Sequence, residues 1–252
     1  MISDLLLLSG NDIPFPEAQL TIHQPTIKEI GYIGEEAFFS GCDLLDFSKN
    51  ILSYEDKVRL EDKSNFEIFM SIMKDKQTMA IQSNKISAML VLSLMFPSYQ
   101  FSFSNDSIVF EKENESGEQE IYFINQDNFE RFKEILVSIF CLNKHKKEEQ
   151  NFNPANERAR KIAEKLQKGR EKVAATKGPQ KISVLSRYIS ILTVGERKNM
   201  NELLSLTVYQ LFDEFERFEL KQAFDTYFKA KLAGAQNIEE VENWMKELHS
   251  ES

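Results

Sequence analysis

The stretch TVYQLFDEFERFELKQAFDTYFKAKLAG, residues 207–234, predicts a long helix around which the rest of the chain is organised. Thr207 and Gln210 have the spacing of a capping box, in which two side chains satisfy backbone N–H groups at a helix start. Acidic residues lie early in the stretch, whereas Lys229 and Lys231 lie just before Gly234. This charge order suits the helix dipole, and glycine readily adopts the left-handed conformation that ends a helix.

The apolar stripe of this predicted helix changes direction near Glu219. The first face consists of Val208, Leu211, Phe212, Phe215 and Phe218, and the second of Leu220, Ala223, Phe224, Tyr227 and Phe228. Either both faces are internal core, or one of them docks on another polypeptide. If the first face packs inside the protein, Phe224, Tyr227 and Phe228 are the candidate partner-binding residues.

The composition limits the classes of protein. The chain has 252 residues, of which 42% are hydrophobic and 28% charged, as in ordinary soluble proteins with a core. It contains 20 Phe but one Trp and 9 Gly, which favours helix-rich packing over a catalytic scaffold built from loops. The net charge of -9 argues against general coating of nucleic acid. We expect a cytoplasmic protein, because the start lacks the basic region of a signal peptide and the apolar run 86–96 is too short to span a membrane.

The first 142 residues predict an α+β domain. We expect short strands at 5–9 and 19–23 and a helix over 26–45 that begins with a Thr26–Glu29 capping box. Further helices are expected at 65–75, 78–96 and from 127 on, the last capped by Asp127 and Glu130. Between them, residues 99–124 alternate with period two and predict a three-stranded antiparallel meander.

A charged segment follows, over residues 143–181. Residues 157–181 contain nine basic and three acidic side chains, so this stretch carries +6 while the rest of the chain carries -15. Three readings are open: a solvated helix, a binding site for an acidic protein partner, or a nucleic-acid site. The candidate partner-binding residues of the second reading are Arg158, Lys161, Lys165 and Lys168.

Residues 182–252 predict an all-α domain. Helices are expected at 183–192 and 200–204, then over 207–234, and finally over 237–249 with Asn237 and Glu240 as its cap. The predicted organisation is therefore an α+β domain (1–142), a charged linker or helix (143–181) and a helical domain (182–252).

No pattern of catalytic or cofactor-binding residues is recognisable. The three histidines lie far apart in sequence and have no metal-ligand spacing, and Cys42 and Cys141 are expected to be free buried thiols. Glu29, Glu35 and Glu36 are carboxylates on a helix rim, where solvation is the usual role. We therefore expect no enzyme, no metal and no cofactor.

Parts of the chain resemble proteins encoded in the tail regions of phages and prophages of Gram-positive bacteria. The residues that carry this resemblance in the C-terminal domain are 206–211, 213–215, 229–235 and Trp244-Met245. In the N-terminal domain, the Leu-Thr-Ile run at 20–22 and the helix start at 25–29 are similar in style to tail and baseplate assembly proteins.

The resemblance implies a non-enzymatic virion morphogenesis protein that acts by protein–protein binding in the host cytoplasm, like a tail assembly chaperone. Expected partners are other tail or baseplate proteins, such as the tape measure protein; no membrane is expected to be involved, and protein is favoured over nucleic acid as the partner. Two alternatives stay open: a baseplate or connector subunit retained in the virion, and a small nucleic-acid-binding regulator that uses the basic segment. The sequence leaves the oligomeric state undefined.

Overall fold

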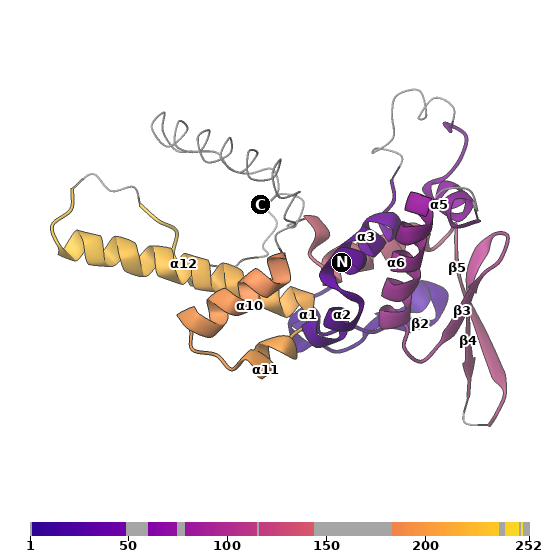
Figure 1. Ribbon diagram of the computed structural model, residues 1–252, viewed down its shortest axis with the longest axis horizontal. Coiled ribbons are helices and arrows are strands. Elements are labelled where there is room, and N and C mark those ends of the chain that lie inside the picture. Colours follow the sequence, from indigo (N-terminus) through magenta and orange to yellow (C-terminus); the bar gives the residue numbers. More distant parts are fainter. Residues whose placement is uncertain are drawn as a thin grey trace.

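The computed structural model describes residues 2–48, 60–74, 79–114, 116–143, 183–236, 240–246 and 248. Figure 1 shows helices and two small antiparallel sheets in the first 143 residues, followed by a group of helices after residue 183. The predicted α+β class is thereby confirmed. The predicted charged segment, including Arg158, Lys161, Lys165 and Lys168, lies outside the described residues from 144 on.

The chain begins with a helix where a strand was predicted. Helix α1 (Asp4–Ser9) starts at Ser3, whose hydroxyl accepts a hydrogen bond from the Leu6 N–H, and ends at Gly10 with φ 68°. A four-leucine run has no period-two alternation, so the cap and the glycine decide its conformation. Strands β1 (Ile13–Phe15) and β2 (Leu20–Ile22) then form a hairpin around a 3₁₀ turn, η1 (Pro16–Ala18).

The predicted helix over 26–45 is two helices. Helix α2 (Ile27–Ile33) begins with the predicted Thr26–Glu29 capping box, and α3 (Glu35–Leu45) follows directly. Gly34 separates them with φ 86°, a backbone conformation outside the α-helical region. The prediction of one continuous helix was therefore wrong, and glycine is the cause.

Helices α3 and α6 (Met79–Met95) approach each other closely. A Cβ atom on Gly41 of α3 would collide with the Ser87 carbonyl of α6 and would lie 2.7 Å from Val91 Cγ2. The contact therefore requires glycine. Helix α5 (Asn65–Lys74) adds Phe66 and Phe69 to the aromatic core of this half, where both rings pack against Phe129.

The predicted meander is confirmed as β3 (Gln100–Phe103), β4 (Ser107–Glu113) and β5 (Gln119–Asn125), in that order in the sheet. Helix α7 (Phe129–Ile139) follows, and its N-cap residue is Asn128, not the predicted Asp127. The Asn128 side chain holds the end of β5, accepting from the Asn125 N–H and donating to the Phe123 carbonyl. All six apolar residues predicted for the inner face are buried: Phe129, Phe132, Ile135, Leu136, Ile139 and Phe140.

The last helices are α10 (Val184–Gly195), α11 (Met200–Leu204) and α12 (Val208–Leu232), close to the predicted ranges. Their inner side chains belong to the same cluster of buried residues as those of the first half, which extends from Leu7 to Phe215. The division into separate domains at 143–181 stays a prediction.

Two helix starts from opposite ends of the chain meet at one junction. The N-cap residues Thr26 and Thr207 form an antiparallel β-bridge, and the Ile27 N–H donates to the Leu206 carbonyl at 2.8 Å. Each threonine is also half of a capping box, with Glu29 and Gln210 respectively. The first turns of α2 and α12 are thus fixed to each other by backbone hydrogen bonding.

A second link joins α3 to α10. The Glu35 carboxylate accepts hydrogen bonds from the Ser183 hydroxyl, from the Val184 N–H at 2.6 Å and from the Leu185 N–H at 3.2 Å. A carboxylate at this position satisfies open N–H groups and the positive end of the α10 dipole. Glu35 is therefore not the solvated rim residue that the sequence suggested.

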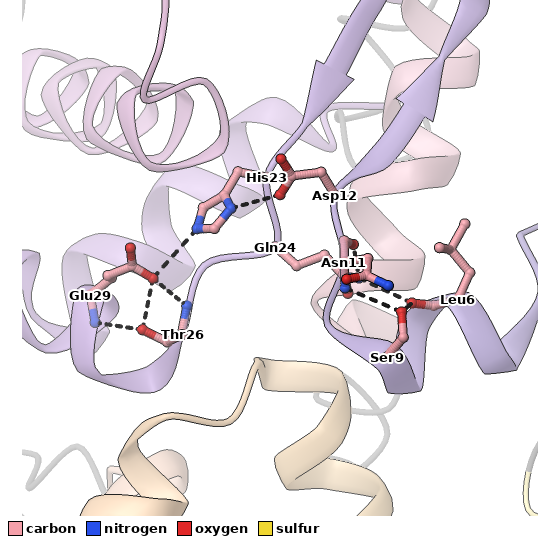
Figure 2. Close-up of polar contacts among 8 residues, drawn as sticks. All are labelled: Leu6, Ser9, Asn11, Asp12, His23, Gln24, Thr26 and Glu29. Atoms are coloured by element: carbon pink, nitrogen blue, oxygen red, sulfur yellow. Dashed lines mark hydrogen bonds and ion pairs between the residues drawn. The ribbon is translucent and has the colours of Figure 1, made fainter.

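Figure 2 shows how Glu29 is held beside His23 at the junction. His23 lies between two carboxylates, with Nδ1 2.9 Å from Asp12 Oδ1 and Nε2 3.6 Å from Glu29 Oε2. The Glu29 carboxylate accepts from the Thr26 N–H and from the Thr26 hydroxyl, each at 2.7 Å. Burial raises the pKa of Glu29, but the hydrogen bonds from Thr26 and the charge of His23 outweigh it, so this pKa lies below its ordinary value.

Candidate partner-binding site

Helix α12 has two halves with different surroundings. The proximal half (208–218) packs into the common core, where Val208, Leu211, Phe212 and Phe215 are buried. The Phe215 ring stacks on Tyr188 of α10, with centroids 3.6 Å apart and an angle of 7° between the planes. The first face predicted for this helix is therefore internal.

The proximal half is also tied to its neighbours by charge. In the loop after α10, the Lys198 ammonium lies 2.5 Å from Glu214 Oε1 of α12 and 3.4 Å from Glu196 Oε2. Gly195 approaches the Phe218 ring so closely that an added Cβ would lie 2.5 Å from Phe218 Cζ. These contacts continue the packing of α10 against α12 as far as Phe218.

The distal half (219–232) extends beyond α10 and α11, away from the N-terminal half of the protein (Figure 1). At 1.5 Å per residue this half is roughly 20 Å long. Phe224 and Phe228 stack on each other with centroids 5.7 Å apart, and the Phe228 side chain is 53% exposed. Leu232, one turn further on, is 79% exposed. The second predicted face (Leu220, Ala223, Phe224, Tyr227 and Phe228) thus lies on the projecting half of the helix. We use the name distal face for its four larger residues together with Leu232.

Lysine accompanies these aromatic residues. The Lys231 ammonium lies 5.2 Å from the centroid of the Tyr227 ring, a cation–π distance. The hydrogen bond with the Tyr227 side chain raises the pKa of Lys231 above its ordinary value, and the Glu240 carboxylate contributes in the same direction. The distal face therefore presents a fixed positive charge beside its rings.

The chain returns to α12 after this helix ends. Arg217 Nη1 donates to the backbone carbonyls of Trp244 and Lys246, at 2.6 Å each. Residues 240–246, which we call the return segment, are not helical, so the helix predicted over 237–249 is wrong for this part. A helix of this length is only marginally stable when it is isolated. In addition, the carbonyls of Trp244 and Lys246 accept hydrogen bonds from Arg217, whereas carbonyls inside a helix accept from backbone N–H groups of the next turn.

The predicted site residues have different outcomes. Phe224, Tyr227 and Phe228 do lie together on one projecting helix, as described above. The four basic residues of the charged segment lie outside the described residues. Sequence reasoning missed Arg217, which holds the return segment, because an arginine in a long polar helix is usually solvated. Its spacing of seven residues from Phe224, and of fourteen from Lys231, was the available signal, since seven residues are close to two helical turns.

The described residues show little that suggests other chemistry. Among them, no group of three or more His, Cys, Asp or Glu side chains is arranged to hold a metal ion. Cys42 and Cys141 are buried and form no disulfide, and burial raises the pKa of Cys42 well above its ordinary value, which keeps this thiol protonated. No helix within the described ranges is long and apolar enough to cross a membrane.

One open cleft lies on the opposite part of the molecule, between α5 and the strand ends. Its volume is about 690 Å³, and its lining includes Lys74, Asp106 and Asp127. The Lys74 ammonium donates to the Asn105 carbonyl at 2.6 Å, so its charge is already engaged with the backbone.

The helices after residue 183 form a unit with a projecting aromatic helix, and this unit is attached to an α+β body. The model of one protein family, the YomV second domain, matches residues 177–249, which include α10, α11, α12 and the return segment. This match points to a family associated with phages and prophages. Comparisons with curated proteins and with solved structures find no match. The phage association expected from the sequence is thus supported for the C-terminal part.

Proposed function

We propose that the protein acts in phage virion morphogenesis, by binding another protein during assembly of the tail or baseplate, and that it catalyses no reaction. The distal face of α12 is the observation that carries this proposal. It exposes aromatic and aliphatic side chains on a helix whose other half is anchored in the core. Exposed apolar patches of this kind commonly mark protein-interaction sites.

The residue types suit a binding hot spot. Aromatic residues dominate the energetics of protein interfaces because they bury a large area with few rotatable bonds. The stacked pair Phe224 and Phe228 restricts both rings before any partner arrives. A preorganised surface loses less conformational entropy on binding.

A chaperone-like role in the host cytoplasm is the form of this function that we favour. A chaperone would cover apolar surface of a tail component, such as the tape measure protein, until assembly. A subunit retained in the particle would use the same surface permanently. Mass spectrometry of purified virions separates the two: we expect the protein to be absent, and stoichiometric presence would make it a structural subunit.

The proposal is tested by affinity purification of the tagged full-length chain from cells in which the phage is replicating. We expect a tail or baseplate protein, identified by mass spectrometry, to co-purify with the wild-type chain and to be lost with Phe228→Ala. Tyr32→Ala is the matched control, because Tyr32 is an aromatic residue of α2 that is 81% exposed. Recovery of no virion protein, or equal recovery with Phe228→Ala, would contradict the proposal.

A further inference from the structure

Strand β5 lies at one edge of the three-stranded sheet and is seven residues long, whereas β3 at the other edge has four. Natural proteins usually shorten, charge or cover their edge strands, because an open edge can pair with a strand of another molecule. Figure 1 shows β5 in a hairpin that projects from the N-terminal half, at the opposite end of the molecule from the distal half of α12. The state of this edge therefore bears on a second interaction surface.

The hydrogen-bond pattern of the sheet shows which backbone groups of β5 point away from β4. Where the register continues past the strand ends, the Asn114 N–H donates to the carbonyl of Glu118, the residue opposite it. In an antiparallel ladder, opposite residues alternate between pairs that exchange hydrogen bonds and pairs that do not. The even-numbered residues of β5 therefore bond to β4, whereas the N–H and C=O groups of Gln119, Ile121 and Phe123 point outward.

Only the C-terminal end of this outward row is covered. The Asn128 side chain donates to the Phe123 carbonyl at 3.0 Å and accepts from the Asn125 N–H at 2.8 Å, which agrees with the outward direction of these groups. Within the part of the chain that the structure describes, no hydrogen bond reaches the N–H groups of Gln119, Ile121 and Phe123 or the carbonyls of Gln119 and Ile121. We call this open row, residues 119–123, the β5 edge.

Large apolar side chains lie on one face of the sheet at the β5 edge. Ile121 is 51% exposed and Phe123 is 47% exposed, and they share a face because alternate residues of a strand point to the same side. Val109 of β4 lies opposite Phe123 on this face and is half-buried. A strand added beside β5 would place its own side chains next to Ile121 and Phe123, so apolar residues fit there.

The opposite face of the β5 edge is acidic. Glu118 and Glu120 alternate with the two apolar residues, and both glutamates are exposed. Hydrogen bonds from the Tyr122 hydroxyl at 2.6 Å and from the Asn114 side chain at 3.4 Å lower the pKa of Glu120 below its ordinary value, so this carboxylate stays charged. Residues 111–120 contain five glutamates and one lysine. Basic residues of an added strand would therefore be attracted to this face.

We infer that the β5 edge binds an extended segment of another protein by strand addition, and that apolar and basic residues alternate in this segment. The outward N–H and C=O groups supply affinity, and the side chains of the added strand supply specificity. Its apolar residues lie beside Ile121 and Phe123, and its basic residues lie beside Glu118 and Glu120. A second copy of the chain fits less well, because pairing of two β5 edges would bring two acidic hairpins together. The inference goes beyond the proposed function and is independent of it, since the β5 edge and the distal face share no residue.

The test uses the purified full-length chain and a short fluorescein-labelled peptide in which valine and lysine alternate. Binding is measured by fluorescence anisotropy. In the antiparallel pairing that continues this sheet, the valines lie opposite Ile121 and Phe123, so the valine N–H groups point to β5. N-methylation of the valines removes these donors and should weaken binding at least about tenfold. N-methylation of the lysines is the matched control, and it should leave the dissociation constant unchanged.

Two measurements on the protein locate the bound peptide. Glu118→Lys reverses a charge beside the β5 edge and should weaken binding about fivefold. Glu202→Lys is its matched control, because it makes the same charge change on α11, and it should have no effect. Amide hydrogen exchange followed by NMR should slow at least about tenfold at Ile121 and Phe123 when the peptide saturates the protein. Exchange in the distal half of α12 should stay the same.

Several results would overturn the inference. One is that the unmethylated peptide does not bind, and another is that the valine-methylated peptide binds as tightly as the lysine-methylated one, or more tightly. Equal affinity of the Glu118→Lys and Glu202→Lys proteins, or unchanged exchange at Ile121 and Phe123, would also contradict it. Failure of the proposed function is distinguishable from these results, because recovery of a virion protein depends on Phe228 and peptide binding does not.

Discussion

The proximal and distal halves of α12 carry similar side chains in opposite surroundings. Both halves have pairs of phenylalanines at four-residue or shorter spacing, and both belong to one uninterrupted helix. In the proximal half Phe212 and Phe215 pack on Tyr188, and in the distal half Phe224 and Phe228 pack mainly on each other. Phenylalanine therefore has a different role in each half of α12, because α10 covers the proximal half and does not extend along the distal half.

The largest expected effect is in the proximal half. Phe215→Ala removes a buried ring that stacks on Tyr188, and we expect a loss of about 3 to 5 kcal/mol in the free energy of unfolding. Chemical denaturation measures it. If the loss were below about 1 kcal/mol, the proximal half would not be part of the core, and the contrast between the halves would fail.

The next effect concerns binding by the distal half. Phe228→Ala removes an exposed ring, and we expect it to weaken association with the virion protein that co-purifies with the wild-type chain by about 2 kcal/mol. The thermal midpoint should stay close to that of the wild-type chain, because alanine is a good helix former and no core contact is lost. A midpoint lowered as far as in Phe215→Ala would show that both faces are core.

A smaller effect is expected at the start of the helix. Thr207→Ala removes the hydroxyl that accepts from the Gln210 N–H, and loss of such a cap costs about 1 kcal/mol in the free energy of unfolding. Binding of the co-purifying virion protein by the distal half should be unchanged, since Thr207 lies in the junction. A change in affinity as large as that of Phe228→Ala would mean that the two halves are coupled through the helix.

The smallest expected effect is a dependence of stability on pH. It arises from Glu29 of α2, the helix that meets α12 at the junction. Because the pKa of Glu29 is lower in the folded protein than in the unfolded chain, its contribution to stability is complete above the unfolded-chain pKa. It is lost as the pH falls through the lower, folded-state value. The measurement is the thermal midpoint from pH 7 to pH 3, a range that spans the ordinary carboxyl pKa of about 4. The midpoint should fall more steeply for the wild-type chain than for Glu29→Gln. Parallel curves would show that Glu29 contributes nothing at this junction.

Much of this fold could be predicted because local signals were unambiguous. The capping boxes at Thr26 and Thr207, the period-two alternation of the meander and the apolar stripe of α7 each specify one local structure. The predictions that failed depended on weaker signals. The leucine run of α1 has no period of its own, and the position of Gly34 within a helical pattern did not reveal that its φ would be positive.

The site was predictable only in part, for a different reason. Sequence periodicity indicates that the stripe of α12 changes direction, and so it places Phe224, Tyr227 and Phe228 on a second face of the helix. It does not indicate which other segment covers each face. Arg217 was missed because its partners are backbone carbonyls of residues 27 and 29 positions later, and carbonyls have no sequence signature. Long-range contacts of this kind depend on the path of the chain.

The junction between Thr26 and Thr207 has a consequence for synthesis on the ribosome. The Ile27 N–H and the Glu35 carboxylate find their partners in Leu206 and in residues 183–185, which are translated more than 140 residues later. The nascent N-terminal half therefore leaves the exit tunnel with these groups unpaired and with part of its core open to water. Because contacts between distant residues form slowly and exposed apolar surface promotes aggregation, translation speed and nascent-chain chaperones should affect the yield of this protein more than its final stability suggests.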